Sequence, residues 1–229
     1  MKNKIPAAII LCGGKGMRLR PLTNDKPKPL IAIDGHPILY HVINHLVKSG
    51  IKKFYIATGY KSIKIEEFMR KSFKKIDYTI INSGDVDILY RIKDCMKYLK
   101  DDFILCYGDT ISNVNIKKLI KYHNEKPDCV TVTSYPVSIP FGLLEINSGG
   151  LVRSFKEKPI LNDSINIGYF YFNHSMRHLL NRKKKLISVI NQLVENRQLR
   201  SYKHKGIHIT INTLAELDYA KQNISKIYK

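Results

Sequence analysis

The sequence predicts an α/β fold, a three-layer α/β/α, Rossmann-like single domain around a central, mostly parallel mixed sheet. Short runs rich in β-branched residues alternate with amphipathic stretches of helical spacing through the first half of the chain, which is typical of βαβ units. With 229 residues and 44% hydrophobic content, the chain can bury one large core. We see no linker or internal repeat, and therefore expect one domain over residues 1–229, with halves at about 1–112 and 113–229.

The first half is expected to alternate strands with helices. Helical spacing is clearest in residues 37–49, where apolar residues fall on one face and Gly50 follows the last of them. The expected strands are residues 7–11, 53–58, 78–81 and 103–107. The expected helices are residues 37–49, 63–73, 88–99 and 115–124.

The second half is expected to be richer in strands and to close with two helices. A Ser-Gly-Gly turn at residues 148–150 separates two of these strands. The expected strands are residues 130–135, 142–146, 151–155 and 167–172, and the expected helices are residues 185–195 and 213–225.

Composition excludes several classes of function. Lys and Arg exceed Asp and Glu by 20 (39 against 19), so the surface attracts anions. The basic residues are nevertheless spread along the chain without interleaved aromatics, and we expect no specific nucleic-acid partner. The four cysteines lack any metal-ligand spacing and are typical of reduced cytosolic thiols. No run approaches the roughly 18 apolar residues that span a bilayer, so we expect a cytoplasmic protein without a membrane partner.

A glycine-rich segment follows the first strand directly. Gly13, Gly14 and Gly16 allow backbone N–H groups to approach a phosphate chain, and Arg18 can clamp phosphate oxygens with its planar fork. The spacing fits neither G-x-x-x-x-G-K-[ST] nor G-x-G-x-x-G, so the two common phosphate-binding motifs are not supported. Lys28 then stands between two prolines, which hold its backbone out of a helix and suit a positioned charge.

The run GGKGMRLRPLTNDKPKPL at residues 13–30, followed by Pro37, resembles the G-G-x-G-x-R-L…P-K-P-L…P signature of the sugar-phosphate nucleotidyltransferase family. Later segments agree in order. Residues 107–109 resemble the family's G-D, residues 155–159 its F-x-E-K-P, and residues 166–170 its N-x-G-x-[YF]. The resemblance therefore covers most of the chain.

The resemblance implies metal-dependent transfer of a nucleoside monophosphate from an NTP to a small phosphorylated acceptor, with release of pyrophosphate. The implied cofactor is Mg²⁺ or Mn²⁺ on Asp109, with Asn212 where most relatives carry a second Asp. The implied catalytic residues are Arg18, Lys28 and Asp109. The implied nucleotide-binding residues are Leu11, Cys12, Gly13, Gly14, Gly16, Arg18, Lys28, Ser83, Gly84, Arg91 and Gly108. The implied acceptor-binding residues are Glu157, Lys158, Asn166 and Gly168.

Within the family the chain looks most like the cytidylyltransferases, because of residues 57–61, 82–85 and 141–144. CTP is therefore the expected nucleotide, with Ser83, Gly84 and Arg91 near base and ribose. The small-residue run that many relatives carry after the N-[ST]-G turn is replaced by residues 87–91, which alters the expected base site.

No short motif in the sequence identifies the acceptor. Phosphoglutamine, used in capsular phosphoramidate synthesis, is favoured because the chain also resembles the cytidylyltransferase that acts on it. Two alternatives stay open: a sugar-1-phosphate nucleotidyltransferase using CTP, UTP, GTP or dTTP, and a non-catalytic nucleotide- or sugar-phosphate-binding regulator. The oligomeric state is also open, although homo-oligomers are common among relatives.

Overall fold

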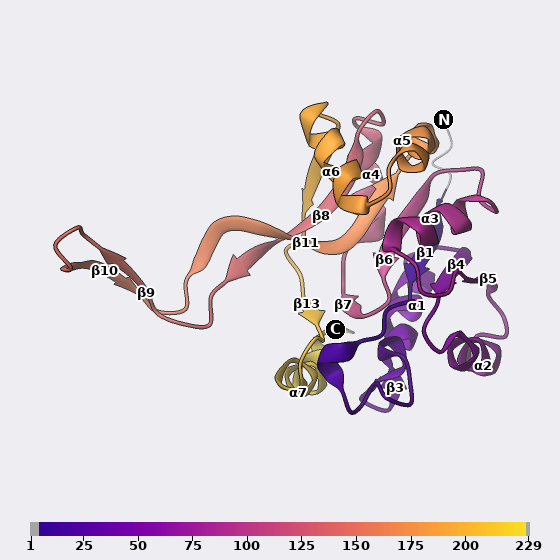
Figure 1. The fold of residues 1–229 in the computed structure, drawn as a ribbon, viewed down its shortest axis with the longest axis horizontal. Helices are drawn as coiled ribbons and strands as arrows, with labels where there is room; N and C mark the ends of the chain where they lie inside the picture. Colours follow the sequence, from indigo (N-terminus) through magenta and orange to yellow (C-terminus); the bar gives the residue numbers. More distant parts are fainter. Residues whose placement is uncertain (1–4, 228–229) are drawn as a thin grey trace.

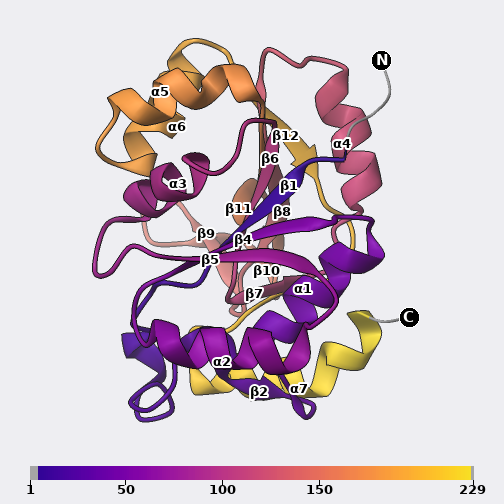
Figure 2. The ribbon, with the colours of Figure 1, turned by 90° about the vertical axis from the view of Figure 1, so that its right-hand side faces the viewer.

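The computed structural model describes residues 5–227 and contains one seven-stranded sheet flanked by helices on both faces (Figures 1 and 2). The strand order is β12-β8-β11-β6-β1-β4-β5, and β11 alone runs antiparallel to its neighbours, so the expected mostly parallel mixed sheet is confirmed. The strands are β1 (Ala7–Leu11), β4 (Lys53–Thr58), β5 (Asp77–Asn82), β6 (Phe103–Tyr107), β8 (Val130–Ser138), β11 (Ile160–Phe172) and β12 (Leu199–Lys203).

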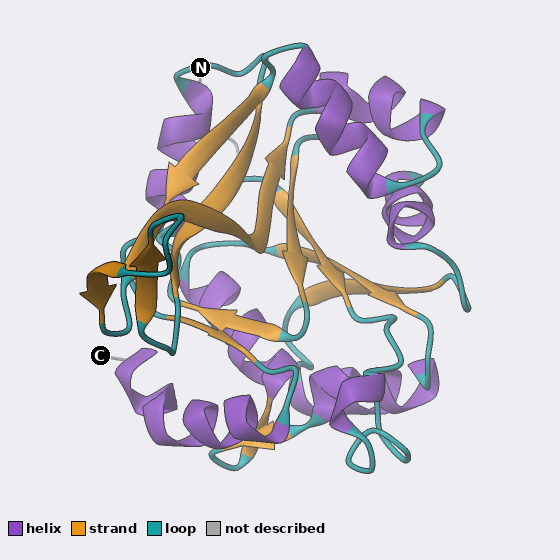
Figure 3. Ribbon diagram, turned by 60° about the vertical axis from the view of Figure 1, so that its left-hand side comes forward, coloured by secondary structure: helices purple, strands orange, loops and turns teal. Residues whose placement is uncertain are grey.

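Within residues 5–227, seven α-helices cover the two faces of the sheet and give the three layers visible in Figure 3. One face packs against α1 (Ile38–Lys48), α2 (Ser62–Ser72), α4 (Ile116–Asn124) and α7 (Leu214–Asn223). The other packs against α3 (Ile88–Met96), α5 (Arg177–Arg182) and α6 (Leu186–Glu195). None of these helices is long and apolar enough to cross a membrane.

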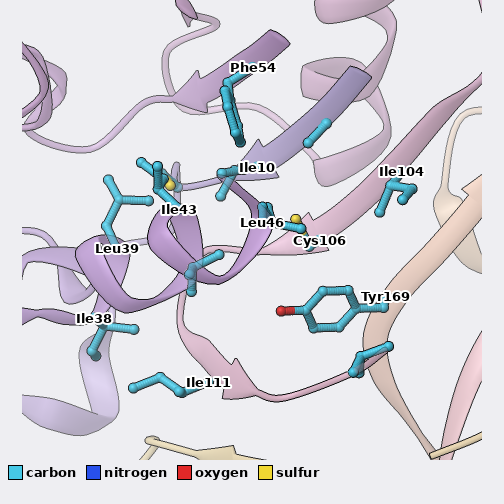
Figure 4. Packing of buried hydrophobic residues seen from close by; sticks show 14 of the residues in the cluster. Ile10, Ile38, Leu39, Ile43, Leu46, Phe54, Ile104, Cys106, Ile111 and Tyr169 are labelled. Carbon is cyan, nitrogen blue, oxygen red and sulfur yellow. The ribbon is translucent and has the colours of Figure 1, made fainter. Parts of the chain in front are cut away.

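The core under α1 shows why the central strands read as continuous apolar runs. Ile10 of β1, Phe54 of β4 and Cys106 of β6 are buried beside Ile43 and Leu46 of α1 (Figure 4). Alternate residues of the same strands face the second core, so neither side of these strands meets water. The carboxyl ends of β1, β4 and β6 therefore belong to strands that are buried along most of their length.

Several short elements were not expected from the sequence. Strand β7 (Thr110–Ser112) pairs with β13 (His208–Thr210), and β2 (Ala32–Ile33) pairs with β3 (His36–Pro37). Strand β12 and helix α5 were also missed. The short elements, α5 among them, are too brief to show a clear apolar periodicity in the sequence. Strand β12 is a partly exposed edge strand of sequence LRSYK, so it contains no buried apolar run that would predict a strand.

A long arm projects from the sheet (Figure 1). Strands β8 and β11 continue beyond the body as a two-stranded ribbon, whose tip is the hairpin of β9 (Leu143–Ile146) and β10 (Val152–Lys156). The last six residues of β11 are buried, whereas its first seven are not. The segment at residues 136–165 is called the arm below.

Candidate active site

The glycine-rich loop begins where β1 ends, at the carboxyl edge of the parallel strands, which is the edge where α/β sheets bind ligands. The backbone N–H of Cys12 donates to the carbonyl of Ala57 at 2.7 Å, and that of Tyr60 donates to the carbonyl of Gly13 at 3.3 Å. The Thr23 hydroxyl donates to the carbonyl of Gly16 at 3.0 Å. The loop is thus pinned to β4 and to the segment that follows it.

Two glycines of this region are required for different geometric reasons, and a third, Gly14, is not. Gly16 has φ 62°, and a Cβ there would lie 3.0 Å from side-chain atoms of Lys28 and Thr23. A Cβ on Gly108 would lie 2.5 Å from the Sγ of Cys12, so the strand ends can approach only with glycine at 108. A Cβ on Gly14 would meet nothing within 4 Å, because this exposed residue faces open space in the cavity.

Four predicted side chains converge below the loop. The Lys28 Nζ donates to Asp109 Oδ2 at 2.6 Å and to Asn212 Oδ1 at 3.0 Å, and Arg18 Nη2 donates to the same Asn212 oxygen at 2.9 Å. The Lys28 side chain is 9% exposed and that of Asp109 35% exposed. The cluster therefore joins residues far apart in the sequence and carries two cations against one carboxylate.

This cluster lines a cavity of about 230 Å³ together with the loop. The cavity is lined by Leu11, Cys12, Gly14, Gly16, Met17, Arg18, Leu19, Lys28, Pro29, Asp109 and Asn212. Eight of these residues were predicted as site residues, and Met17, Leu19 and Pro29 were not. Burial raises the pKa of the Cys12 thiol, with Cys106 and Asp109 adding to the effect, so Cys12 is a neutral wall of the cavity.

Asn212 is positioned by the start of α7. The backbone N–H groups of Asn212 and Thr213 both donate to Glu216 Oε2, and the Thr213 hydroxyl accepts from Glu216 N in a capping box. The amide oxygen of Asn212 is left to point at Lys28 and Arg18.

The residues fit a hard divalent cation. Asp109 Oδ2 and Asn212 Oδ1 both lie within 3.0 Å of one point, the Lys28 ammonium, so the two oxygens already converge on a cation. A carboxylate oxygen and an amide oxygen suit Mg²⁺ or Mn²⁺ when phosphate oxygens and water supply the other ligands. Within residues 5–227, no group of three or more His, Cys, Asp or Glu side chains could hold a metal ion.

Arg91 lies behind the loop rather than in the cavity. Its guanidinium fills the space beside Gly13 and Gly59, where an added Cβ would come within 2.2 Å of Nη1. Nη1 donates to the carbonyl of Thr58 at 2.6 Å, and burial lowers the pKa of this 6% exposed side chain. The Gly84 carbonyl is beside Gly59 as well. The loops after β1, β4 and β5 therefore meet around one buried cation, and Ser83 and Gly84 belong to that meeting point.

The predicted acceptor residues are divided between two places. Asn166 Oδ1 accepts from Gly168 N at 2.8 Å, and a Cβ on Gly168, whose φ is 80°, would lie 2.6 Å from the ring of Tyr107. Asn166 and Gly168 therefore lie beside Tyr107, two residues before Asp109 in the sequence. Burial raises the pKa of Tyr107, and the Asp109 charge adds to the rise. Glu157 and Lys158 instead lie on the arm between β10 and β11, with side chains 61% and 68% exposed.

Two contacts were missed by the sequence interpretation. Gly59 directly follows β4 and is as closely packed on Arg91 as Gly13 is, and its place at a strand end was the available signal. An ion pair of Lys15 Nζ with Asp85 Oδ2 at 2.6 Å connects the glycine loop to the loop before α3. No local sequence pattern predicts this contact, because the two residues are 70 positions apart.

Comparisons with known proteins identify the family of the chain. The glucose-1-phosphate cytidylyltransferase of Salmonella typhimurium is 32% identical over 240 residues, covering 93% of both chains. A Bacillus subtilis protein named "Probable glucose-1-phosphate cytidylyltransferase" is 32% identical and covers 92% of both. The solved structure of HddC from Yersinia pseudotuberculosis has the same fold, with a TM-score of 0.76 at 22% identity over 96% of this chain and 100% of that one. Residues 7–208 match the family described as Nucleotidyl transferase, and with its glycine loop set over Lys28 and Asp109, the chain belongs to that family.

Proposed function

We propose that the protein transfers CMP from CTP to a small phosphorylated acceptor, a sugar 1-phosphate in the first place, and releases pyrophosphate. The observation that carries the proposal is the contact of Lys28 with Asp109 and Asn212 at the floor of a glycine-lined cavity. A deep lysine beside hard oxygen ligands and open backbone amides suits a triphosphate rather than a neutral ligand.

In this reaction the protein positions the two substrates and neutralises the charge of their phosphate groups. An acceptor phosphate oxygen attacks the α-phosphorus of CTP in line and forms the new P–O bond, and the bond to the β-phosphate oxygen breaks with its electron pair leaving on pyrophosphate. The amides at Gly14 and Gly16 and the Arg18 guanidinium hold the β- and γ-phosphates. Lys28 neutralises charge on the α-phosphate, where it grows in the transition state.

A divalent cation on Asp109 and Asn212 would supply further neutralisation of phosphate oxygens. Asn212 carries no charge, so the site of Arg18, Lys28 and Asp109 keeps an excess of one positive charge. Such a site favours a highly charged nucleotide over the bare metal ion.

CTP is proposed as the nucleotide because the two cytidylyltransferase relatives cover nearly the whole chain. Ser83 and Gly84 would lie near the base, beyond Arg91. The same relatives support a hexose 1-phosphate as acceptor. Phosphoglutamine is kept as a second acceptor, because no short motif of the sequence identifies the acceptor.

Pyrophosphate release tests the proposal. Purified protein with Mg²⁺ or Mn²⁺ would be assayed with CTP, UTP, GTP, ATP or dTTP, each against sugar 1-phosphates and phosphoglutamine. Release with CTP and one acceptor is expected. Binding of CTP without release from any pair would favour the regulator instead.

Substitutions then assign the release to this cavity. Lys28→Ala and Asp109→Asn should each lower turnover by roughly 10²-fold or more, the scale for one lost transition-state contact. Lys26→Ala is the matched control, because Lys26 is exposed and only two residues away on the same proline-bounded segment. Turnover in Lys28→Ala equal to that of the control would refute the assignment.

A further inference from the structure

The segment that joins Arg18 to Lys28 is a surface loop. Residues 20–26 form turns and bends, and all of them except Thr23 are exposed. Within the segment, the Asn24 N–H donates to the Pro21 carbonyl at 2.9 Å. The place of Lys28 relative to Arg18 therefore depends on side chains that reach this segment from other parts of the chain.

Tyr60 reaches the segment from the end of β4. Its hydroxyl lies 3.1 Å from the carbonyl oxygens of both Thr23 and Asn24. A hydroxyl has one hydrogen to donate, so this hydrogen is shared between two consecutive carbonyls and fixes the course of the backbone there. The backbone of Tyr60 is held as well, since its N–H donates to the Gly13 carbonyl at 3.3 Å. One tyrosine thus contacts the chain on both sides of Arg18.

Thr23 connects this contact to the glycine loop and to Lys28. It is 1% exposed, and its hydroxyl donates to the Gly16 carbonyl at 3.0 Å. Gly16 packs between the two side chains, because a Cβ added there would lie 3.0 Å from both Lys28 Cβ and Thr23 Cγ2. A shift of Thr23 would therefore be passed to the backbone of Lys28.

Lys28 has little freedom to compensate for such a shift. Its two flanking prolines restrict the backbone. The N–H groups of Leu30 and Ile31 close a tight turn around it, at 2.9 Å from the Pro27 carbonyl and 3.0 Å from the Lys28 carbonyl. The ammonium at the far end of this stiff turn lies 2.6 Å from Asp109 Oδ2. Misplacement of a reacting group by about 1 Å can cost on the order of 10²-fold in rate.

We propose that Tyr60 is a positioning residue for the transfer reaction, whose hydroxyl holds the segment at residues 20–26 so that the Lys28 ammonium meets the α-phosphate. The inference rests on the proposed function. Tyr60 is outside the set of described residues that line the cavity, so it acts through Lys28 and does not touch the nucleotide.

The same strand offers a matched control near its other end. The Tyr55 hydroxyl also donates to a backbone carbonyl, that of Tyr98 at 2.8 Å. Tyr98 lies between α3 and β6, so this contact is near the amino end of β6, away from the edge of the sheet that carries the cavity. Tyr60→Phe and Tyr55→Phe each remove one hydroxyl and keep the ring.

The two variants should differ in catalysis much more than in stability. Both should shift the midpoint of urea unfolding slightly and to a similar extent, because each loses a hydroxyl bond to the backbone. Tyr60→Phe alone should lower kcat, by about 10-fold, a part of the roughly 10²-fold expected for loss of Lys28 itself. The KM for the acceptor should stay within about 2-fold of the wild-type value. Equal kcat in the two variants would overturn the proposal.

A second background separates positioning from a merely structural role. In a chain that carries Lys28→Ala, the ammonium that Tyr60 positions is gone, so adding Tyr60→Phe should lower turnover by no more than about 2-fold. A further loss of about 10-fold in that background would show that Tyr60 acts independently of Lys28, which contradicts the inference.

Hydrogen exchange measures the positioning without any substrate. The amides of Leu30 and Ile31 close the turn at Lys28, so they should exchange at least about 5-fold faster in Tyr60→Phe than in the wild type and remain unchanged in Tyr55→Phe. Faster exchange in Tyr60→Phe, together with a wild type that releases pyrophosphate from no substrate pair, refutes the proposed function and leaves the positioning by Tyr60 standing. An active wild type, with the same exchange in both variants, refutes the positioning and leaves the function standing.

Discussion

Two adjacent glycines should respond to the same substitution in opposite ways. Gly13 and Gly14 follow each other in the loop, but an added Cβ at Gly13 would lie 2.2 Å from Arg91 Nη1, whereas one at Gly14 would meet nothing within 4 Å. Gly13→Ala should therefore destabilise the fold, and Gly14→Ala should leave it intact and disturb the cavity.

The loss of stability expected for Gly13→Ala follows from the displacement of the Arg91 guanidinium. The guanidinium has to move, which breaks its 2.6 Å hydrogen bond to the Thr58 carbonyl. A hydrogen bond from a charged donor is worth about 1.5–3 kcal/mol, and overpacking adds about 1–3 kcal/mol. We expect a loss of about 2–4 kcal/mol, because the relaxation that breaks the bond also relieves part of the overlap.

Gly14→Ala should change the free energy of unfolding by less than about 1 kcal/mol, with a small gain where the unfolded chain loses freedom. Its methyl group occupies the space that the phosphates need, so kcat/KM for the NTP should fall by at least about 10-fold. Urea unfolding and steady-state kinetics on both variants give the comparison. The double variant Gly13→Ala/Arg91→Ala should lose less stability than the sum of its single changes.

Equal loss of stability in the two alanine variants would refute the placement of Arg91 behind the loop. Additive losses in the double variant would refute its direct conflict with a side chain at position 13.

Three further predictions concern acid stability, thiol reactivity and the helix cap. Burial lowers the pKa of His123 and of His208 to about 4, so the folded state favours neutral rings. The free energy of unfolding should fall as pH drops from about 6.5 towards 4, by on the order of 2 kcal/mol at pH 5 for each of these two histidines. His208→Leu should therefore reduce the loss at pH 5 by on the order of 2 kcal/mol in urea titrations, and an unchanged pH dependence would contradict the assignment. Burial raises the pKa of the Cys12 and Cys106 thiols, and raises the pKa of Cys95 to about 12. Cys129 alone should therefore react rapidly with a disulfide reagent in the folded protein, because it is the one cysteine of the four that is not buried. Fast reaction of two or more thiols before denaturation would contradict this. Thr213→Ala should cost about 1 kcal/mol of stability through the lost capping box and raise KM for CTP, and an unchanged KM would mean that the cap does not position Asn212.

The fold was predictable where buried strands and amphipathic helices alternate. The strands at residues 7–11, 53–58 and 103–107 agree with the structure to the residue, because both faces of each are largely buried and most of their residues are apolar. Strand β12 was missed because its residues LRSYK face water in part, and parallel pairing with β8 holds it in place. Strand β11 extends seven residues further than expected, since its exposed start is stabilised by main-chain pairing within the arm.

The site was predictable where the motif is local and less so where it depends on long-range packing. Gly14, Gly16, Arg18 and Lys28 are near neighbours in sequence, and the structure brings them to one cavity with Asp109 and Asn212. The burial of Arg91 behind Gly13 and Gly59 joins three loops, and only the tertiary structure reveals it. The direction of the arm, which separates Glu157 and Lys158 from the cavity, likewise follows from pairing between distant strands.

The arm shares no core with the sheet, and this has a consequence for how the protein can change. The residues around the glycine loop are fixed by packing on both faces of β1 and β6, so most substitutions there lower the stability of the whole domain. Substitutions in β9, β10 and their connections touch exposed positions instead. The arm can therefore change in sequence at little cost to the stability of the domain, while the residues around the glycine loop cannot.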